Sequence, residues 1–342
     1  MELSFWTKLR IWAVLAVGVV LIGILAWPMV APGPYGVLSV TIGSVSFGQA
    51  IILALLAVIT GLLGYFVSWP YSREVGILAV PAGLGIWAFR CGEMRSLLLE
   101  NPTVSQQQQL FAALKWEPFF WLLIVAMGFL GVVIGQLIAQ PKFLTADDTE
   151  QSDKKKFSLS SLIIFGNPYI VNLMLAKTLP HLNSKSEKSQ AKTTSRQNEY
   201  LNILIALVGS FLIAQFCIGI FTQNVKMADE QLGTVVAQPA VGQIALAVTV
   251  SFAIAAFVVK KFLNASYIWP IIASSFVMIF SVRSYVNEQV FQRLVDNWPP
   301  VFFYRAVTAI LPIQIVSFAA LGAIAGYWLA VRYNYWRKHE IK

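Results

Sequence analysis

Long apolar stretches recur along the chain, and polar or charged segments separate them. Eight of these stretches approach the length of about 20 residues that a helix needs to cross a bilayer. They are too continuous for the alternating pattern of a membrane β-barrel, so we predict helical spans. The predicted spans are residues 11–31, 48–70, 75–90, 118–140, 200–222, 241–259, 265–282 and 306–331.

The third stretch, residues 75–90, is the shortest and is interrupted by Pro81 and two glycines. Its counterpart later in the chain, residues 265–282, contains Pro270 near its start. Helix breakers are tolerated in a membrane where neighbouring helices cover the freed backbone groups. We therefore expect both segments to lie inside the bundle rather than to face lipid. Seven spans, with residues 75–90 not crossing, are the alternative.

The apolar pattern also recurs at long range. Residues 130–139 read LGVVIGQLIA and residues 321–330 read LGAIAGYWLA. This match places Gly131 and Gly135 opposite Gly322 and Gly326, and both pairs have the spacing that lets two helices approach closely. We interpret this motif as packing, either between the two halves or in a dimer.

Polar residues extend this match upstream. The pairs, at offsets of 190 to 194, are Gln49 with Gln243, Arg90 with Arg283, and Lys115 with Arg305. The pattern predicts an all-α membrane protein of two tandem four-helix repeats in the same orientation, related by an axis along the membrane normal. The predicted units are residues 1–140 and 200–342. Chance similarity between two apolar, glycine-containing stretches is the alternative.

Residues 141–199 form a charged linker between these units. Residues 181–199 have almost nothing to bury and are predicted to be flexible. Residues 157–180 are apolar but are split by Gly166-Asn167-Pro168, so we expect a short interfacial helical piece rather than a further span.

Two other long loops, residues 91–117 and 284–304, follow the third span of each unit. Each is predicted to contain a short amphipathic helix that leads through proline and aromatic residues into the next span. Thr103 has the position and side chain of a helix N-cap in the first of them.

Composition places the chain in a membrane. Hydrophobic residues make up 57% of the 342 positions, charged residues only 12%, and the mean hydropathy is +0.68. With eight spans and an inside N-terminus, 18 of the 25 Lys and Arg residues lie on the cytoplasmic side, which agrees with the positive-inside rule. The net charge of +9 is thereby explained without nucleic acid. We predict a plasma (inner) membrane protein with both termini in the cytoplasm.

The search for catalytic chemistry finds no phosphate-binding loop, no metalloprotease motif and no nucleophile elbow. Cys91 and Cys217 have no metal or redox spacing, and no cofactor or metal site is predicted. No Asp or Glu lies in the central part of a predicted span, which argues against a proton relay.

The strongest candidate site is basic. Arg90, Lys115, Arg283 and Arg305 are all predicted at the outer boundary of the membrane, where they would line a vestibule that holds an anionic solute or a lipid headgroup. Gln49 and Gln243 are matched polar residues near the outer ends of their spans. The alternative is that the four cations reach to the interface and pair with carboxylates such as Glu93 and Glu288.

Two functions fit this pattern better than an enzyme does. The first is a non-catalytic subunit or scaffold of a larger membrane complex, with lipid, partner membrane proteins or a second copy as its contacts. The second is a transporter with a basic vestibule between the repeats. A scaffold requires a filled core, whereas transport requires an aqueous cavity between the halves.

Overall fold

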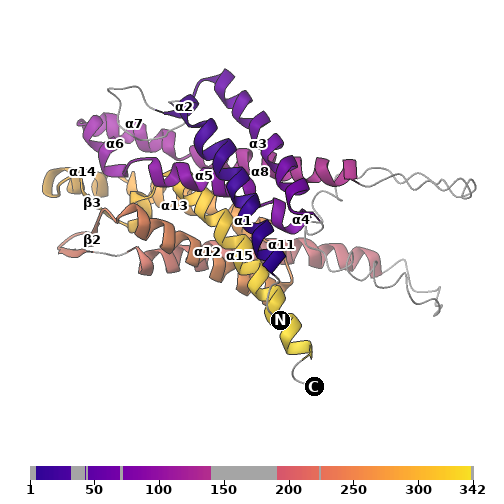
Figure 1. Cartoon of the computed structure of the whole chain (residues 1–342). Coiled ribbons are helices and arrows are strands. Elements are labelled where there is room, and N and C mark those ends of the chain that lie inside the picture. The colour runs from indigo at the N-terminus through magenta and orange to yellow at the C-terminus, as the bar shows by residue number, and fades with distance from the viewer. Residues whose placement is uncertain are drawn as a thin grey trace, which may run out of the picture.

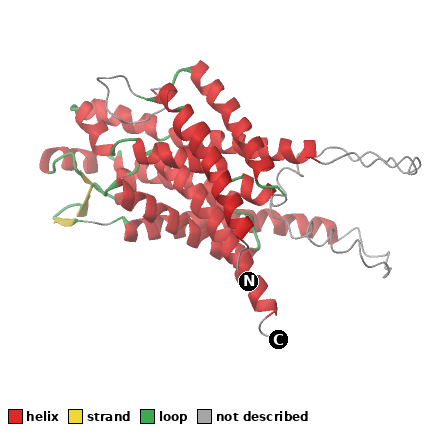
Figure 2. Ribbon diagram, in the orientation of Figure 1, coloured by secondary structure: helices red, strands yellow, loops and turns green. Residues whose placement is uncertain are grey.

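The computed structural model describes residues 5–31, 43, 45–69, 72–139, 191–222 and 225–339, which form a helical bundle (Figures 1 and 2). About 81% of the structure is helical, which confirms the all-α membrane class. Residues 140–190 of the chain, including the predicted interfacial piece, lie outside the described residues. The elements before this gap are α1 (Phe5–Gly18), its π-helical continuation η1 (Val19–Leu25), α2 (Trp27–Val30), α3 (Phe47–Val67), α4 (Ser72–Gly76), α5 (Ala79–Arg90), α6 (Met94–Glu100), α7 (Val104–Leu114) and α8 (Glu117–Ala139).

Long helices also dominate the part of the chain after the gap. Seven helices of the described chain are long and apolar enough to cross a membrane. An eighth crossing results if Glu74–Arg90 and Met94–Glu100, which are bent by 53°, form one broken span. The elements are α11 (Ala191–Phe221), β1 (Lys226–Asp229), β2 (Gly233–Ala237), α12 (Val241–Leu263), α13 (Ile268–Tyr285), α14 (Glu288–Asn297), β3 (Phe302–Phe303), the 3₁₀ turn η3 (Ala306–Ala309) and α15 (Pro312–His339).

Helices α5 and α15 occupy the interior of the bundle. In α5, every residue from Ala79 to Gly85 is buried, together with Trp87 and Ala88. The apolar window of α15 is 72% buried, whereas the corresponding windows of the peripheral helices α1 and α11 are 22% buried. Helix α13 is intermediate at 56%. The segment around Pro81 is therefore shielded by neighbouring helices, as predicted. Helix α13 is buried at Pro270 but exposes Phe276 and Phe280, so the prediction that it does not face lipid holds only in part.

The predicted glycine motifs lie where helix backbones approach each other. A Cβ atom at Gly131 of α8 would overlap with the carbonyl oxygen of Val58 in α3. A Cβ atom at Gly322 of α15 would overlap with the carbonyl oxygen of Thr249 in α12. In each pair the partner carbonyl lies 73 positions before the glycine. Each contact lies within one half of the chain: Gly131 with Val58 before the gap, and Gly322 with Thr249 after it.

The second glycines of the two motifs also lie in helix contacts. Gly326 approaches the carbonyl oxygen of Ala253, and Gly135 packs against the ring of Tyr65. Contacts of this kind bring backbones close enough for dispersion forces and weak Cα–H donors to hold the helices together in lipid.

The described ends of the chain and the helix ends on either side of the gap lie at one end of the bundle. In Figure 1 the N-terminus, the C-terminus, the end of α8 and the start of α11 all lie toward the right of the view. Helices α6, α7 and α14 and the strands lie at the opposite end. We refer to these four features (α6, α7, α14 and the sheet β1–β3) as the platform.

A small antiparallel sheet in the platform was not predicted. Strand β1 pairs with β2, and β2 pairs with β3 through Val236 opposite Phe303. Gly233, with a φ angle of +77°, provides the left-handed conformation in the turn between β1 and β2. Strands of two to five residues are too short to produce a visible alternation in the sequence.

The two predicted amphipathic loops do contain short helices, namely α7 and α14. Thr103 caps α7 as predicted, and the Gln106 side chain completes a capping box by accepting from the Thr103 backbone amide. Phe111 of α7 packs against Tyr285 and Phe291, with ring centroids 4.5 Å and 6.3 Å away. This buried aromatic cluster fixes the platform to the end of α13.

We expect Gly322→Ala to destabilise the protein by about 1–3 kcal/mol, because the added methyl group must displace the backbone of α12. The control is Gly209→Ala in α11, where a Cβ atom meets nothing within 4 Å; this change should be neutral or slightly stabilising. Thermal unfolding of both variants in the same detergent measures the difference. Equal midpoints would contradict the close helix contact.

Candidate functional site

An open cleft at the platform end of α13 contains two of the four predicted cations. Its volume is about 390 Å³. The walls come from the last turns of α13, from α14 and from the segment that joins β3 to η3. The lining residues are Phe280, Arg283, Ser284, Asn287, Val290, Tyr304 and Arg305. We refer to this feature as the arginine cleft.

Local structure fixes both arginines. Arg283 lies in the last turn of α13, where positive charge interacts favourably with the helix dipole. Arg305 immediately precedes η3, and its carbonyl oxygen accepts hydrogen bonds from the backbone amide and the hydroxyl of Thr308 at 3.1 Å and 2.6 Å. The guanidinium carbon of Arg305 lies 5.3 Å from the centre of the Tyr304 ring. The second arginine is therefore held against an aromatic wall of the cleft.

The chemistry of the arginine cleft suits an anion. Guanidinium groups are permanently charged and present a planar fork of donors that matches phosphate or carboxylate oxygens. Among the side chains that the structure describes, no carboxylate lies within ion-pair distance of Arg283 or Arg305. The side chain of Glu288, predicted as an alternative partner, is outside the described residues. Ser284, Asn287 and Tyr304 add neutral hydrogen-bonding groups to the lining.

The other two predicted cations do not line this cleft. An Nη1 donor of Arg90 lies 3.5 Å from the carbonyl oxygen of Gly23, and its guanidinium carbon lies 5.4 Å from the Trp27 ring centre. Lys115 lies over Trp116, with its ammonium nitrogen 5.4 Å from the ring centre. Glu93, predicted as a partner of Arg90, instead forms an ion pair of 3.0 Å with Arg95.

The matched glutamines lie at helix ends. Gln49 completes a capping box with Ser46 at the start of α3. Gln243, in the first turn of α12, donates to the carbonyl oxygen of Phe221 at 3.2 Å and so connects α12 to the end of α11. Neither residue lines the arginine cleft.

Two further buried polar residues have structural roles. For Gln314, a helix-to-helix hydrogen bond is what a polar side chain within a span predicts, whereas the role of Glu117 was missed. Gln314 of α15 is fully buried, accepts from the Leu311 amide at 3.0 Å and donates to the Ala88 carbonyl of α5 at 3.2 Å. Glu117, at the start of α8, is 99% buried and accepts a hydrogen bond of 3.0 Å from the Trp121 indole. The position of Glu117 directly before Pro118 could have indicated that it lies at the start of a helix, because acidic residues favour the first turn.

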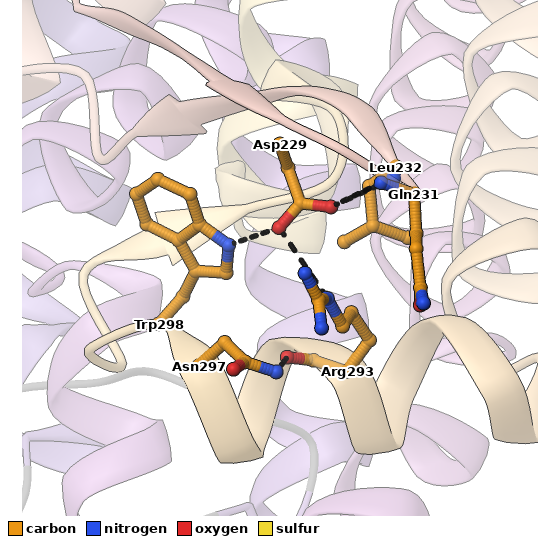
Figure 3. A network of polar contacts seen from close by, with 6 residues as sticks. All are labelled: Asp229, Gln231, Leu232, Arg293, Asn297 and Trp298. Carbon is orange, nitrogen blue, oxygen red and sulfur yellow. Dashed lines mark hydrogen bonds and ion pairs between the residues drawn. The ribbon is translucent and has the colours of Figure 1, made fainter.

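A polar network around Asp229 holds the platform together (Figure 3). One carboxylate oxygen accepts from the backbone amides of Gln231 and Leu232 at 2.9 Å and 2.8 Å. The other accepts from the Trp298 indole at 2.7 Å and lies 3.5 Å from Nε of Arg293. Asp229 thus connects the β1–β2 turn to α14, which also forms a wall of the arginine cleft.

These contacts favour the ionised carboxylate. The hydrogen bond from Trp298, the two backbone donors and the nearby Arg293 lower the pKa of Asp229 from 3.8 to about 2. The Asp229 carboxylate therefore remains charged wherever the platform is folded and the solution is near neutral.

Comparison with known proteins gives no relative: no family model, no curated protein and no solved structure matches the chain. The described residues contain no group of three or more His, Cys, Asp or Glu side chains that could hold a metal ion. Both cysteines are unpaired, and Cys91 is buried. Functional interpretation therefore depends on the geometry of the bundle, the platform and the arginine cleft.

We expect Asp229→Asn to loosen the β1–β2 turn and its contact with α14, because the neutral amide loses the ion pair and one of its two acceptor oxygens. In the wild-type protein, the stabilisation from a lowered pKa is complete above the ordinary value of 3.8 and is lost as the pH falls through about 2. Hydrogen exchange of the hairpin amides, corrected for intrinsic rates, should show protection that declines between pH 4 and pH 2. The Asp229→Asn variant should lack this acid-dependent step.

The control is Asp296→Asn, which changes an exposed carboxylate on the same helix, α14. Its exchange profile should follow that of the wild-type protein. An acid-dependent step that survives in Asp229→Asn would assign the effect to another group.

Proposed function

We propose that this chain is a non-catalytic membrane subunit of a larger membrane complex. The observation that carries this proposal is the direct packing of α5 against α15, at the place where a path between the halves would run. Phe89 and Phe318 lie edge to face with centroids 5.2 Å apart, and the Gln314 side chain bonds across to α5. A filled contact of this kind supports a scaffold rather than a transporter.

The platform supports the same proposal. It stands at the end of the bundle away from the termini, and its parts are joined by the Asp229 network and by the Phe111–Tyr285–Phe291 cluster. Rigid, pre-ordered surfaces bind partners at a lower entropic cost than flexible loops do. We infer that the platform contacts the extramembrane part of a partner membrane protein.

We also propose that the bundle consists of two equivalent four-helix units in the same orientation. The equal spacing of the Gly131–Val58 and Gly322–Thr249 contacts supports this relation. So do the matching neighbours of the two peripheral helices: α1 contacts α3 and α5, and α11 contacts α12 and α13. Four crossings per unit would place both termini and the lysine-rich linker on the cytoplasmic side.

The orientation can be tested by labelling cysteines in intact cells with a membrane-impermeant maleimide. In a Cys217→Ala background, we expect Leu99→Cys in the platform to react from outside. Tyr335→Cys near the C-terminus should react only after the membrane is permeabilised. Both side chains are exposed, at 61% and 48%, so full labelling of each after permeabilisation is the control. Equal reaction of the two positions in intact cells would overturn the proposed topology.

The scaffold proposal predicts a partner in stoichiometric amount. Purification from native membranes in a mild detergent should yield an assembly larger than one or two copies of the chain, with a second membrane protein in fixed ratio. The combined change Asp229→Asn and Trp298→Phe should reduce the yield of the partner at least several-fold without lowering the amount of chain in the membrane. The control Asp296→Asn should retain the partner.

The outcome that would contradict the scaffold proposal is a chain that purifies as a monomer or dimer carrying only lipid. Movement of a solute across the membrane of vesicles that contain only the purified chain would favour the transport alternative instead.

A further inference from the structure

We infer that the arginine cleft binds the phosphate group of an anionic phospholipid. The inference is independent of the proposed partner, because it concerns the chain alone. Its first basis is the pairing of Arg283 and Arg305 in one open cleft with three neutral hydrogen-bonding side chains. Two guanidinium groups can bind the non-bridging oxygens of one phosphate, and the neutral groups suit the ester oxygens and a polar headgroup.

The second basis is the position of the cleft along α13. Phe280, Arg283 and Ser284 have the i, i+3, i+4 spacing of a single helix face, and Asn287 follows at the start of α14. Helix α13 is a candidate span that ends at Tyr285, so Arg283 lies in its last turn, at the level where lipid headgroups meet water. The cleft therefore begins on an apolar helix surface and ends in positive charge.

The apolar part of this face extends toward the centre of the membrane. Phe276 and Phe280 are 42% and 47% exposed, and Phe211 of α11 packs edge to face on Phe280 at 5.6 Å. Arg283 lies seven positions after Phe276, which corresponds to about 10 Å along a helix. A free phosphate ion would use only the charged end of this face. A phospholipid would use the charged end for its phosphate and the phenylalanine surface for its acyl chains, so the geometry favours the lipid.

Lipid retention by the purified chain tests the inference. The protein is placed in nanodiscs of phosphatidylcholine with a minor fraction of phosphatidylglycerol, then transferred to detergent, and the lipid that remains is measured by native mass spectrometry. We expect the wild-type chain to retain phosphatidylglycerol selectively. Each of Arg283→Gln and Arg305→Gln should reduce this retention about tenfold, because each removes one charge-assisted contact.

The matched control is Arg90→Gln, which removes an exposed arginine from the corresponding position of the first half. Arg90→Gln should leave phosphatidylglycerol retention unchanged. The thermal stability of all three variants should equal that of the wild-type chain. Equal retention by the wild-type chain and the Arg283→Gln/Arg305→Gln double variant would overturn the inference, as would equal loss in Arg90→Gln.

A second comparison separates lipid from free phosphate. Phe280→Ala should weaken phosphatidylglycerol retention, and glycerophosphate without acyl chains should compete only at concentrations far above those of the lipid. Competition by glycerophosphate or inorganic phosphate at concentrations comparable with the lipid would overturn the lipid assignment in favour of a soluble phosphate ligand. The lipid experiment uses the purified chain without a partner, so a negative result leaves the scaffold proposal unaffected. Failure to find a partner in native membranes likewise leaves the lipid result unaffected.

Discussion

Close approach of helix backbones is the constraint on which this bundle depends. Lipid tails are as apolar as leucine side chains, so burial of apolar surface alone cannot hold membrane helices together. The protein meets this constraint with glycines at contacts such as Gly131 on Val58 and Gly322 on Thr249, where no larger residue fits. These contacts join α3 to α8 and α12 to α15. With those pairs in place, α5 and α15 pack in the interior. The chain can accommodate a helix as short as α5 because its neighbours bury it from Ala79 to Gly85.

The position of the platform is set by the ends of α5 and α13. Helix α5 ends at Arg90, and the chain turns by 53° into α6 instead of continuing along the same axis. Helix α13 ends at Tyr285 with the ring buried against Phe111 of α7 and Phe291 of α14. The loops that leave these ends are thus packed onto the bundle rather than left in solvent. Asp229 then connects the hairpin to α14 and gives that end of the bundle a fixed shape.

The sequence predicted the features that depend on composition and helical periodicity. Seven apolar helices of spanning length, the burial of the residues around Pro81 and Pro270, and the N-cap at Thr103 all follow from local rules, and the structure contains them. The third predicted span, residues 75–90, crosses only if it forms one broken span with α6. The sheet was missed because its pairing joins β2 to β3 across about 65 residues and leaves only a short local pattern. The pairing of Arg283 with Arg305 was predicted only as part of a group of four. Which cations share a cleft depends on side-chain contacts such as Arg90 with Gly23 and Trp27, and no local pattern encodes these.

The different surroundings of Arg90 and Arg283 also bear on the proposed duplication. In the first half, the π-helical segment η1 and the short helix α2 bring the Gly23 carbonyl and the Trp27 ring to Arg90. In the second half, α11 continues as a regular helix to Phe221 and the chain then enters the hairpin. Among the described residues, Arg283 has no comparable carbonyl or ring contact, and it lines the arginine cleft together with Arg305. On the proposed duplication and the proposed lipid site, this difference in helix geometry would separate an arginine that contacts its own bundle in the first unit from an arginine that binds a ligand in the second.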